Sequence, residues 1–401
     1  MTAARKARCN DVAMPAPPLR PADATQDSGG SSRGSRQLLV VSHPAVVSVN
    51  QEVYRELARR GWELTIVLPR YWRHAYAEGR VTPTALEGLE SSLRPTPVLF
   101  AGKPQRHIYL TRCSALCRRL RPDVAFLEAE PFALAAAQWG RALAGLGIPF
   151  GVQSYENIDR GFPRPVRALR SRVLAQASFV AARSDTAGEL ARRWGARGEI
   201  GLALPAVPLW GAVPEQPAER PFTVGYAGRL VQEKGLTDLL DAVRELGAPV
   251  ELLLIGDGEM RSRLQGQPIP GSSVRVLHGL RHDEMAGAYA QLDVLVLPSH
   301  TTETWKEQLG RVIVEALSCG VPVIGSDSGE IPWLVGLTGG GLCFPEGDAH
   351  ALAQQLQRLR EDPALRERLA RDGGAAVQRL FTVPAATDAL ERLLIGALER
   401  G

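Results

Sequence analysis

The chain has 401 residues and a formal net charge of +4; 45% of its residues are hydrophobic and 22% are charged. This length suits two or three globular domains, and the ordinary composition excludes collagen, a coiled coil and wholesale disorder. No run of 18 apolar residues occurs, so no membrane-spanning segment is expected. Acidic and basic residues are mixed along the chain, which gives no reason to expect a nucleic-acid partner.

The first 36 residues are rich in Ala, Pro, Ser and Gly and show no apolar periodicity, which predicts a disordered tail over 1–36 without an export signal. The five cysteines are scattered and odd in number, which favours a reducing, cytoplasmic location. Cys113 and Cys117 lie one helical turn apart, but no second Cys/His pair completes a zinc set. We therefore expect both to be packing residues.

From Gln37 onward, short apolar runs alternate with amphipathic helical patterns, one of which ends at Gly61 while another covers 133–147. This alternation predicts βαβ units around a parallel sheet, in an N-terminal domain over 37–204. The predicted strands cover residues 38–42, 63–69, 123–128, 149–154 and 178–182.

Residues 205–221 carry five prolines in seventeen positions, so we interpret them as a linker. A second α/β alternation then predicts a C-terminal domain over 222–383, and a last helix over 384–401 that could cross back to the first domain. Two doubly wound domains would face each other across a ligand-binding cleft. The strands of the second domain are predicted at 222–228, 250–256, 274–279, 293–298 and 321–326, with helices at 348–361 and 363–380.

The segment "GYAGRLVQEKGL" (225–236) carries the first chemical motif. Gly228 and Arg229 follow a predicted strand, and Lys234 stands where the next helix opens. Backbone amides at a helix start, with one guanidinium fork and one ammonium charge, suit a diphosphate. The alternative is a plain strand–loop–helix with two solvated cations.

The segment "LLIGDGEMRSRL" (253–264) resembles part of a dinucleotide fingerprint. Arg261 occupies the position of the third glycine, and no acidic residue follows about twenty positions later at a strand end. The full fingerprint is therefore not met, which disfavours an NAD-dependent oxidoreductase.

The segment "TWKEQLGRVIVEALSCGVPVIGSDSGEIP" (304–332) holds two glutamates eight positions apart. On one continuous helix Glu307 and Glu315 would point about 80° apart, so we expect Glu307 on a loop and a helix that begins near Gly310. The amides of Gly310 and Arg311 would then face phosphate or sugar oxygens. Glu315 would accept hydrogen bonds from a vicinal diol and Glu307 from a hexose hydroxyl. An acidic amphipathic helix would explain Glu315 but not the whole string.

In order and separation over about 220–348, these three motifs resemble the retaining, nucleotide-sugar-dependent glycosyltransferases of family 4, which have the GT-B fold of two Rossmann-like domains. The resemblance implies no metal or other cofactor, and no Asp-x-Asp occurs. It also implies that Gly228, Arg229 and Lys234 hold the donor diphosphate. Glu315 would bind the ribose and Glu307 the transferred sugar. The remaining donor contacts would come from Arg281 at the base edge and from the backbone of Leu309, Gly310, Arg311 and Val312.

The N-terminal half resembles the family more loosely. "SHPAVVSVNQ" (42–51) stands where the family carries a Gly-Gly loop, so His43 and Asn50 are acceptor-side candidates. The other acceptor-side candidates are Glu128 and Glu130, which stand at another predicted strand end.

"QSYENID" (153–159) falls where the family places a polar residue near the anomeric carbon, which makes Glu156 and Asn157 catalytic candidates alongside Arg229, Lys234 and Glu307. A helix-start carboxylate and a helix cap are equally consistent with the two residues.

A basic stripe of Arg164, Arg167 and Arg170 lies in a predicted helix over 163–175. It could hold an anionic or lipid-linked acceptor at a membrane surface, although most stripes of this kind are simply solvated.

The sequence thus predicts a retaining enzyme that moves a hexose-type sugar from a nucleotide diphosphate sugar to an acceptor hydroxyl; a UDP-sugar is favoured as the donor and a GDP-sugar is the alternative. The alternatives are a GT-B sugar phosphorylase, a nucleotide-sugar epimerase, and a non-catalytic sugar-nucleotide-binding protein.

Overall fold

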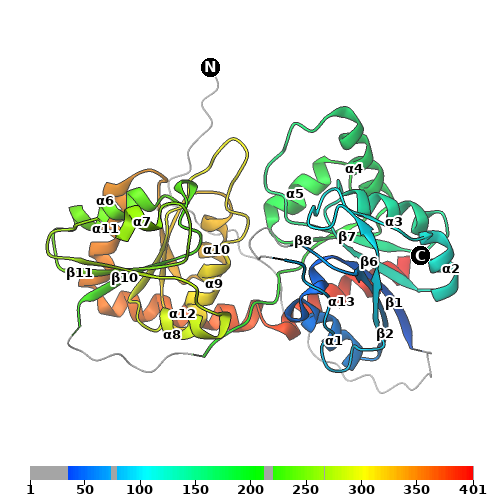
Figure 1. Ribbon diagram of the computed structural model, residues 1–401, viewed down its shortest axis with the longest axis horizontal. Helices are drawn as coiled ribbons and strands as arrows, with labels where there is room; N and C mark the ends of the chain where they lie inside the picture. The colour runs from blue at the N-terminus through cyan, green and yellow to red at the C-terminus, as the bar shows by residue number, and fades with distance from the viewer. Residues whose placement is uncertain (1–34, 74–78, 212–219, 266, 401) are drawn as a thin grey trace.

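The computed structural model describes residues 35–73, 79–211, 220–265 and 267–400. These form two α/β lobes that lie side by side (Figure 1). Nearly all of the predicted tail (1–34) and the middle of the predicted linker (212–219) lie outside the described residues.

The first lobe is built on a seven-stranded parallel sheet in the order β3-β2-β1-β6-β7-β8-β9. A small antiparallel pair, β4 (Val98–Leu99) and β5 (Ile108–Tyr109), stands apart from it. The strands of the main sheet are β1 (Arg36–Ser42), β2 (Trp62–Pro69), β3 (Leu93–Thr96), β6 (Val124–Glu128), β7 (Phe150–Ser154), β8 (Phe179–Ala182) and β9 (Glu199–Leu202). The helices of this lobe are η1 (Pro44–Val46), η2 (Ser48–Gln51), α1 (Glu52–Arg59), α2 (Cys113–Leu120), α3 (Leu134–Ala144), α4 (Arg164–Gln176) and α5 (Asp185–Arg193).

The second lobe repeats the plan with a six-stranded parallel sheet in the order β12-β11-β10-β13-β14-β15. Its strands are β10 (Phe222–Ala227), β11 (Val250–Ile255), β12 (Ser273–Leu277), β13 (Val294–Leu297), β14 (Val323–Ser326) and β15 (Gly341–Phe344). Its helices are η3 (Gln232–Lys234), α6 (Leu236–Glu245), α7 (Arg261–Gln265), η4 (His282–Glu284), α8 (Met285–Tyr289), α9 (Arg311–Ser318), α10 (Ile331–Thr338), α11 (Ala349–Glu361) and α12 (Pro363–Leu380).

In each sheet the first strand in the sequence, β1 or β10, lies in the interior and has later strands on both sides. The chain therefore reverses its direction of travel beside that strand. Loops that leave neighbouring strands there diverge to opposite faces and open a crevice at the carboxyl ends, which is where α/β folds bind ligands.

The last helix, α13 (Val383–Arg400), leaves the second lobe and packs against α1, β6, β8 and β9 of the first (Figure 1). Its buried residues Leu390, Leu393 and Leu394 join the apolar core under the first sheet. Arg60 of the first lobe contacts Asp388 at 2.6 Å and Glu391 at 2.8 Å. The final helix was predicted over 384–401 with a possible return to the first domain, and α13 makes that return.

The predicted pair of doubly wound parallel sheets is confirmed, and all ten predicted strands occur within two residues of their predicted limits. The strands missing from the prediction include β3, β9 and β15, which lie at sheet edges and are only partly buried. Cys113 and Cys117 are buried in the core of the first lobe. Among the residues that the structure describes, no helix is both long and apolar enough to cross a membrane.

Candidate active site

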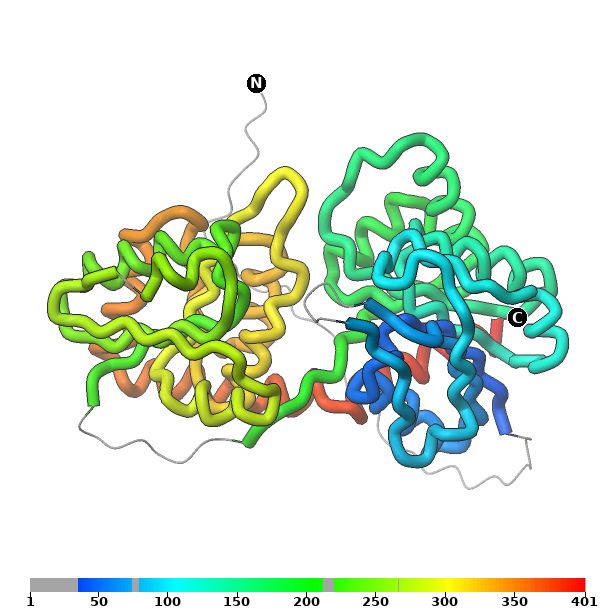
Figure 2. Tube along the Cα trace, viewed as in Figure 1, coloured from blue at the N-terminus to red at the C-terminus, as the bar shows by residue number. Residues whose placement is uncertain are grey.

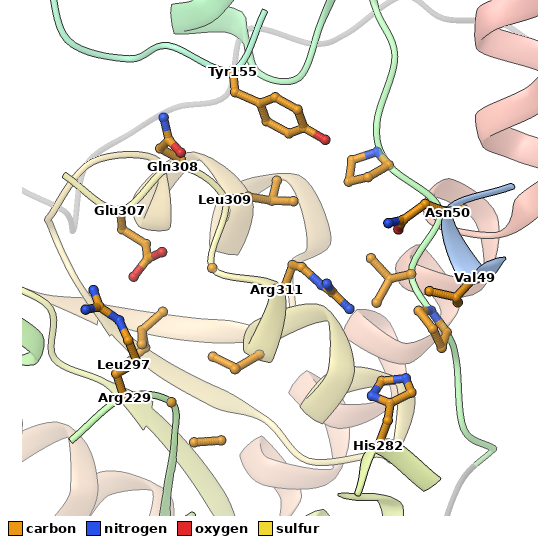
Figure 3. Close-up of a pocket in the computed structure, with 18 of the residues that line it drawn as sticks. Val49, Asn50, Tyr155, Arg229, His282, Leu297, Glu307, Gln308, Leu309 and Arg311 are labelled. Carbon is orange, nitrogen blue, oxygen red and sulfur yellow. The ribbon is translucent and has the colours of Figure 1, made fainter. Parts of the chain in front are cut away.

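A cavity of about 1090 Å³ opens between the two lobes (Figure 3). The first lobe contributes Val49, Asn50 and Tyr155, and the crossing segment contributes residues 205–208. The second lobe contributes most of the predicted donor residues: Gly228, Arg229, Lys234, Glu307, Leu309, Gly310, Arg311 and Val312.

The loop that carries Arg229 is held in place by contacts with Tyr226 and Gly256. It follows β10 directly, and the hydroxyl of buried Tyr226 donates to the Arg229 carbonyl at 2.7 Å. The Gly-x-Gly turn after β11 packs against the same loop. Gly256 has φ +149°, and a Cβ there would lie 1.8 Å from the Gly228 carbonyl oxygen. The second sequence motif therefore supports the first one rather than forming a site of its own.

Lys234 and Glu307 form the charged centre of the cavity. The Lys234 ammonium lies 2.5 Å from a carboxylate oxygen of Glu307, and both side chains are largely buried. Ser299 donates to the same oxygen at 3.1 Å, and the Trp305 ring lies 4.5 Å from the ammonium. Arg229 is more open, with 42% of its side chain exposed and Glu233 at 3.4 Å. The cavity is thus lined by one buried cation, Lys234, and by two more exposed ones, Arg229 and Arg311.

Helix α9 begins at the cavity wall, and Glu307 lies on the preceding loop, as the eight-residue spacing of the glutamates predicted. Gly310 is its N-cap with φ +68°, and a Cβ there would lie 3.1 Å from Leu297. The start of a helix offers unpaired backbone N–H groups and a partial positive charge, which suit an anionic ligand.

Glu315 and Arg281 do not line the cavity. Glu315 is 9% exposed; it accepts from the Tyr289 hydroxyl at 2.8 Å and lies 3.4 Å from Arg311, which does line the cavity. Arg281 lies on the surface, paired with Asp283 at 2.6 Å, and its neighbour His282 lines the cavity instead. The base-edge contact of Arg281 therefore stays a prediction, and His282 is the η4 residue that lines the cavity. The ribose contact of Glu315 stays a prediction.

A second cavity, of about 510 Å³, lies in the first lobe and shares Asn50, Tyr155 and Gln308 with the first. The predicted acceptor-side residues and the catalytic candidate Glu156 converge there, because they stand at the ends of adjacent parallel strands: His43 follows β1, Glu128 and Glu130 lie at the end of β6, and Glu156 follows β7. We call this cavity the acceptor-side cavity and the first one the donor cavity, after the predicted residues that line them. Three carboxylates in one cavity offer many acceptors for hydroxyl or amino groups.

Two of these carboxylates are held by the protein itself. Glu128 accepts from the hydroxyls of Ser42 and Tyr54, both at 2.5 Å, and burial raises its pKa. Glu130 accepts from the Tyr155 backbone N–H at 2.6 Å and from the Ser154 hydroxyl at 3.1 Å. Burial outweighs these hydrogen bonds and raises the pKa of Glu130 to about 7. Glu130 therefore changes charge near neutral pH.

The raised pKa of Glu130 predicts how stability depends on pH. The native state keeps a proton that the unfolded chain releases near pH 4.5, so Glu130 lowers the free energy of unfolding as pH rises from 4.5 to 7, by up to about 3 kcal/mol. Glu130→Gln should remove this part of the slope. Urea unfolding of both proteins at pH 5 and pH 8 measures it, and equal differences between the two pH values would contradict the assignment.

Glu156 and Asn157 have different surroundings. Glu156 lines the acceptor-side cavity but is paired with Arg160 at 2.9 Å. Asn157 lines neither cavity, and its amide donates across the lobes to the Glu307 carbonyl at 2.8 Å. Asn157 therefore contacts the Glu307 loop rather than a cavity. Tyr155 and Gln308 were not among the predicted site residues, yet both line the first cavity (Figure 3) and also the second. The position of Tyr155, directly after β7, was the available signal.

Glu330 makes a further contact between the lobes. It precedes α10 of the second lobe and lies at the first turn of α5, where the Thr186 hydroxyl donates to it at 3.3 Å. Trp333 donates to Asp185 at 2.9 Å beside it. Burial raises the pKa of Glu330. These contacts hold the two lobes together next to the cavity.

Comparison with known proteins places this architecture in a family. Residues 213–374 match the family described as "Glycosyl transferases group 1", and residues 45–205 match the "Glycosyl transferase 4-like domain". A 2-deoxystreptamine N-acetyl-D-glucosaminyltransferase from Streptomyces fradiae is 31% identical, with 75% of this chain and 78% of that protein covered. The chain belongs to this family of group 1, family 4-like glycosyltransferases.

Other relatives of the chain match over a shorter part of its length. The lipopolysaccharide core biosynthesis glycosyltransferase LpsE of Rhizobium meliloti is 34% identical over 45% of this chain and 51% of its own length, so the chain spans about half of that relative. Among solved structures, sucrose-phosphate synthase from Thermosynechococcus elongatus has a TM-score of 0.66 at 20% identity, with 91% of this chain and 100% of that chain covered. Anabaena HepE in complex with UDP has a TM-score of 0.66 at 18% identity, with 90% and 99% covered. Both show the shared GT-B fold.

Proposed function

We propose that this glycosyltransferase moves a hexose-type sugar from a UDP-sugar to an acceptor hydroxyl with retention of anomeric configuration. The observation that carries the proposal is that Arg229, Lys234, Glu307 and the start of α9 line a single cavity between the lobes. Two cations and a helix N-terminus provide the charge that a departing diphosphate needs.

The proposed reaction is a displacement on one face of the sugar. The bond from the anomeric carbon to the diphosphate oxygen breaks, and a bond to the acceptor oxygen forms on the same face. The leaving diphosphate takes the acceptor proton. Arg229 and Lys234 stabilise the developing negative charge, so we propose that no metal is required. Glu307 accepts from a sugar hydroxyl, and Tyr155 and Gln308 lie where donor and acceptor would meet.

The comparisons support a uridine nucleotide as the donor and suggest more than one class of acceptor. HepE has been solved with UDP and with UDP-glucose, which favours a uridine donor over a guanosine one. Two relatives, from Streptomyces fradiae and Streptomyces kanamyceticus, are named for transfer to 2-deoxystreptamine, an amine-bearing acceptor, whereas LpsE is named for lipopolysaccharide core synthesis. The carboxylates of the acceptor-side cavity would suit the hydroxyl and amino groups of the first class.

Thermal unfolding in the presence of nucleotides tests the donor. UDP at about one hundred times its dissociation constant should stabilise the fold by about 2.7 kcal/mol and raise Tm by several degrees, while GDP should raise it less. Turnover is then measured as nucleoside diphosphate released with a panel of acceptors that includes 2-deoxystreptamine, with and without EDTA. A phosphorylase would require inorganic phosphate, an epimerase would need no acceptor, and a binding protein would show the Tm shift without turnover. No release with any donor and acceptor would overturn the proposal.

A further inference from the structure

A third cavity, of about 350 Å³, lies in the first lobe and shares no lining residue with the two described above. It is formed by one side of α4 and by the residues that end α5. Four of the residues that line it are arginines: Arg164, Arg167 and Arg170 from α4, and Arg193 from α5. The proposed transfer reaction uses none of them.

Arg170 is the buried member of this arginine cavity. It is only 5% exposed, and its guanidinium carbon lies 3.8 Å from the centre of the Trp194 ring. Its Nε and Nη1 atoms are buried without a hydrogen-bond partner in the described structure. Burial lowers the pKa of Arg170. Donors that are buried without an acceptor cost free energy, so an acceptor that reached Arg170 from the cavity would offset this cost.

The carboxylates near Arg170 do not balance the arginines. Asp159 lies 4.0 Å from Arg193, and one of its oxygens accepts from the Trp194 ring N–H at 2.8 Å. Glu156 also attracts Arg170, but it is paired with Arg160 at 2.9 Å. The Ser171 hydroxyl donates a hydrogen bond to the Trp194 carbonyl at 3.0 Å. The cavity therefore keeps an excess of positive charge.

The spacing of the three arginines on α4 explains how they meet. Residues 164, 167 and 170 follow one another at intervals of three, which places them along one side of a helix. This stripe was expected to be either solvated or a membrane contact. The structure shows that its third member is buried against Trp194 rather than solvated.

We propose that the arginine cavity binds a phosphate-type oxyanion. Guanidinium groups bind phosphate in a planar, two-pronged manner, and Arg170 is held in a fixed orientation by its stacking on Trp194. The phosphate group could belong to a free solute or to the headgroup of an anionic lipid. The proposal is independent of the transfer reaction, since the cavity shares no residue with the donor and acceptor cavities.

Two assays on the full chain distinguish the sources. Isothermal titration with sodium phosphate, against sodium chloride at equal ionic strength, measures binding of the free ion. Co-sedimentation with phosphatidylcholine vesicles, with and without phosphatidylglycerol, measures binding of a headgroup. Arg167→Gln and Arg193→Gln remove one lining arginine each, and Arg172→Gln is the matched control, because Arg172 is exposed on α4 but does not line the cavity.

We expect each lining variant to weaken binding about five- to tenfold in whichever assay shows it, and the control to change it less than twofold. Arg170→Lys keeps the charge but loses the two-pronged guanidinium, so it should weaken binding at least as much as the two Gln variants do. Its Tm should stay within a few degrees of that of the wild type. Loss of phosphate binding identifies a free solute, and loss of phosphatidylglycerol-dependent sedimentation identifies a lipid. Absence of binding in both assays, or an equal loss in Arg172→Gln, would overturn the proposal.

Discussion

Lys234→Ala is expected to lower kcat/KM for the sugar nucleotide by about 100- to 1000-fold, and Arg229→Ala by somewhat less. Both cations line the donor cavity and would stabilise the charge of the leaving diphosphate. The larger loss is expected at Lys234 because this side chain is the more buried of the two and also holds the carboxylate of Glu307 at 2.5 Å. Without Lys234, the described contacts to that carboxylate reduce to the Ser299 hydroxyl.

Steady-state kinetics with the best donor from the nucleotide screen measures both losses. Arg263→Ala is the control, since it removes one exposed cation from the same lobe without touching the cavity. Lys234→Arg keeps the charge but changes its shape, and should recover only part of the activity. Wild-type rates in both alanine variants would show that Arg229 and Lys234 do not bind the diphosphate, even if the nucleotide still raised Tm.

Gly256→Ala is expected to destabilise the second lobe by about 3 kcal/mol or more and to abolish most of the activity. A Cβ at this position would lie 1.8 Å from the Gly228 carbonyl oxygen, and φ is +149°. The backbone of the Arg229 loop must therefore move, although residue 256 does not line the donor cavity.

Gly271→Ala is the matched control for backbone strain. Gly271 also has positive φ, at +74°, but a Cβ there meets no atom within 4 Å. Gly271→Ala should lower the free energy of unfolding by only about 1–2 kcal/mol and leave kcat/KM unchanged. Urea unfolding and steady-state kinetics of both variants measure the difference. If Gly256→Ala resembled Gly271→Ala in both respects, the supporting role of the Gly-x-Gly turn would be wrong.

The sequence predicts the interior of each sheet well and its margins poorly, for a physical reason. Interior strands such as β1 and β11 are buried on both faces and appear as continuous apolar runs. Edge strands such as β3 and β9 are partly exposed, and β3 contains Pro95, so no such run marks them.

The candidate site divides in a similar way. Residues on loops that directly follow strands, such as Arg229 and Glu130, reach a cavity because the end of a parallel strand fixes where the loop starts. The depth of Glu315 depends instead on contacts with Arg311 and Tyr289. Gln308 faces both cavities only because the lobes meet there, which local sequence patterns do not encode.

The return of α13 to the first lobe means that the backbone passes between the lobes twice (Figure 2). The two passages touch, since the Val207 N–H donates to the Phe381 carbonyl at 2.9 Å, and Val207 and Val383 both line the donor cavity. A rotation of the lobes about that junction would have to break the hydrogen bonds that Asn157, Thr186 and Trp333 make between the lobes. A protein cut at the linker would not yield independent halves, because the first would lack the apolar stripe of Leu390, Leu393 and Leu394 that closes its core. Because residues of this junction also line the cavity, a rotation of one lobe against the other would change the shape of the cavity.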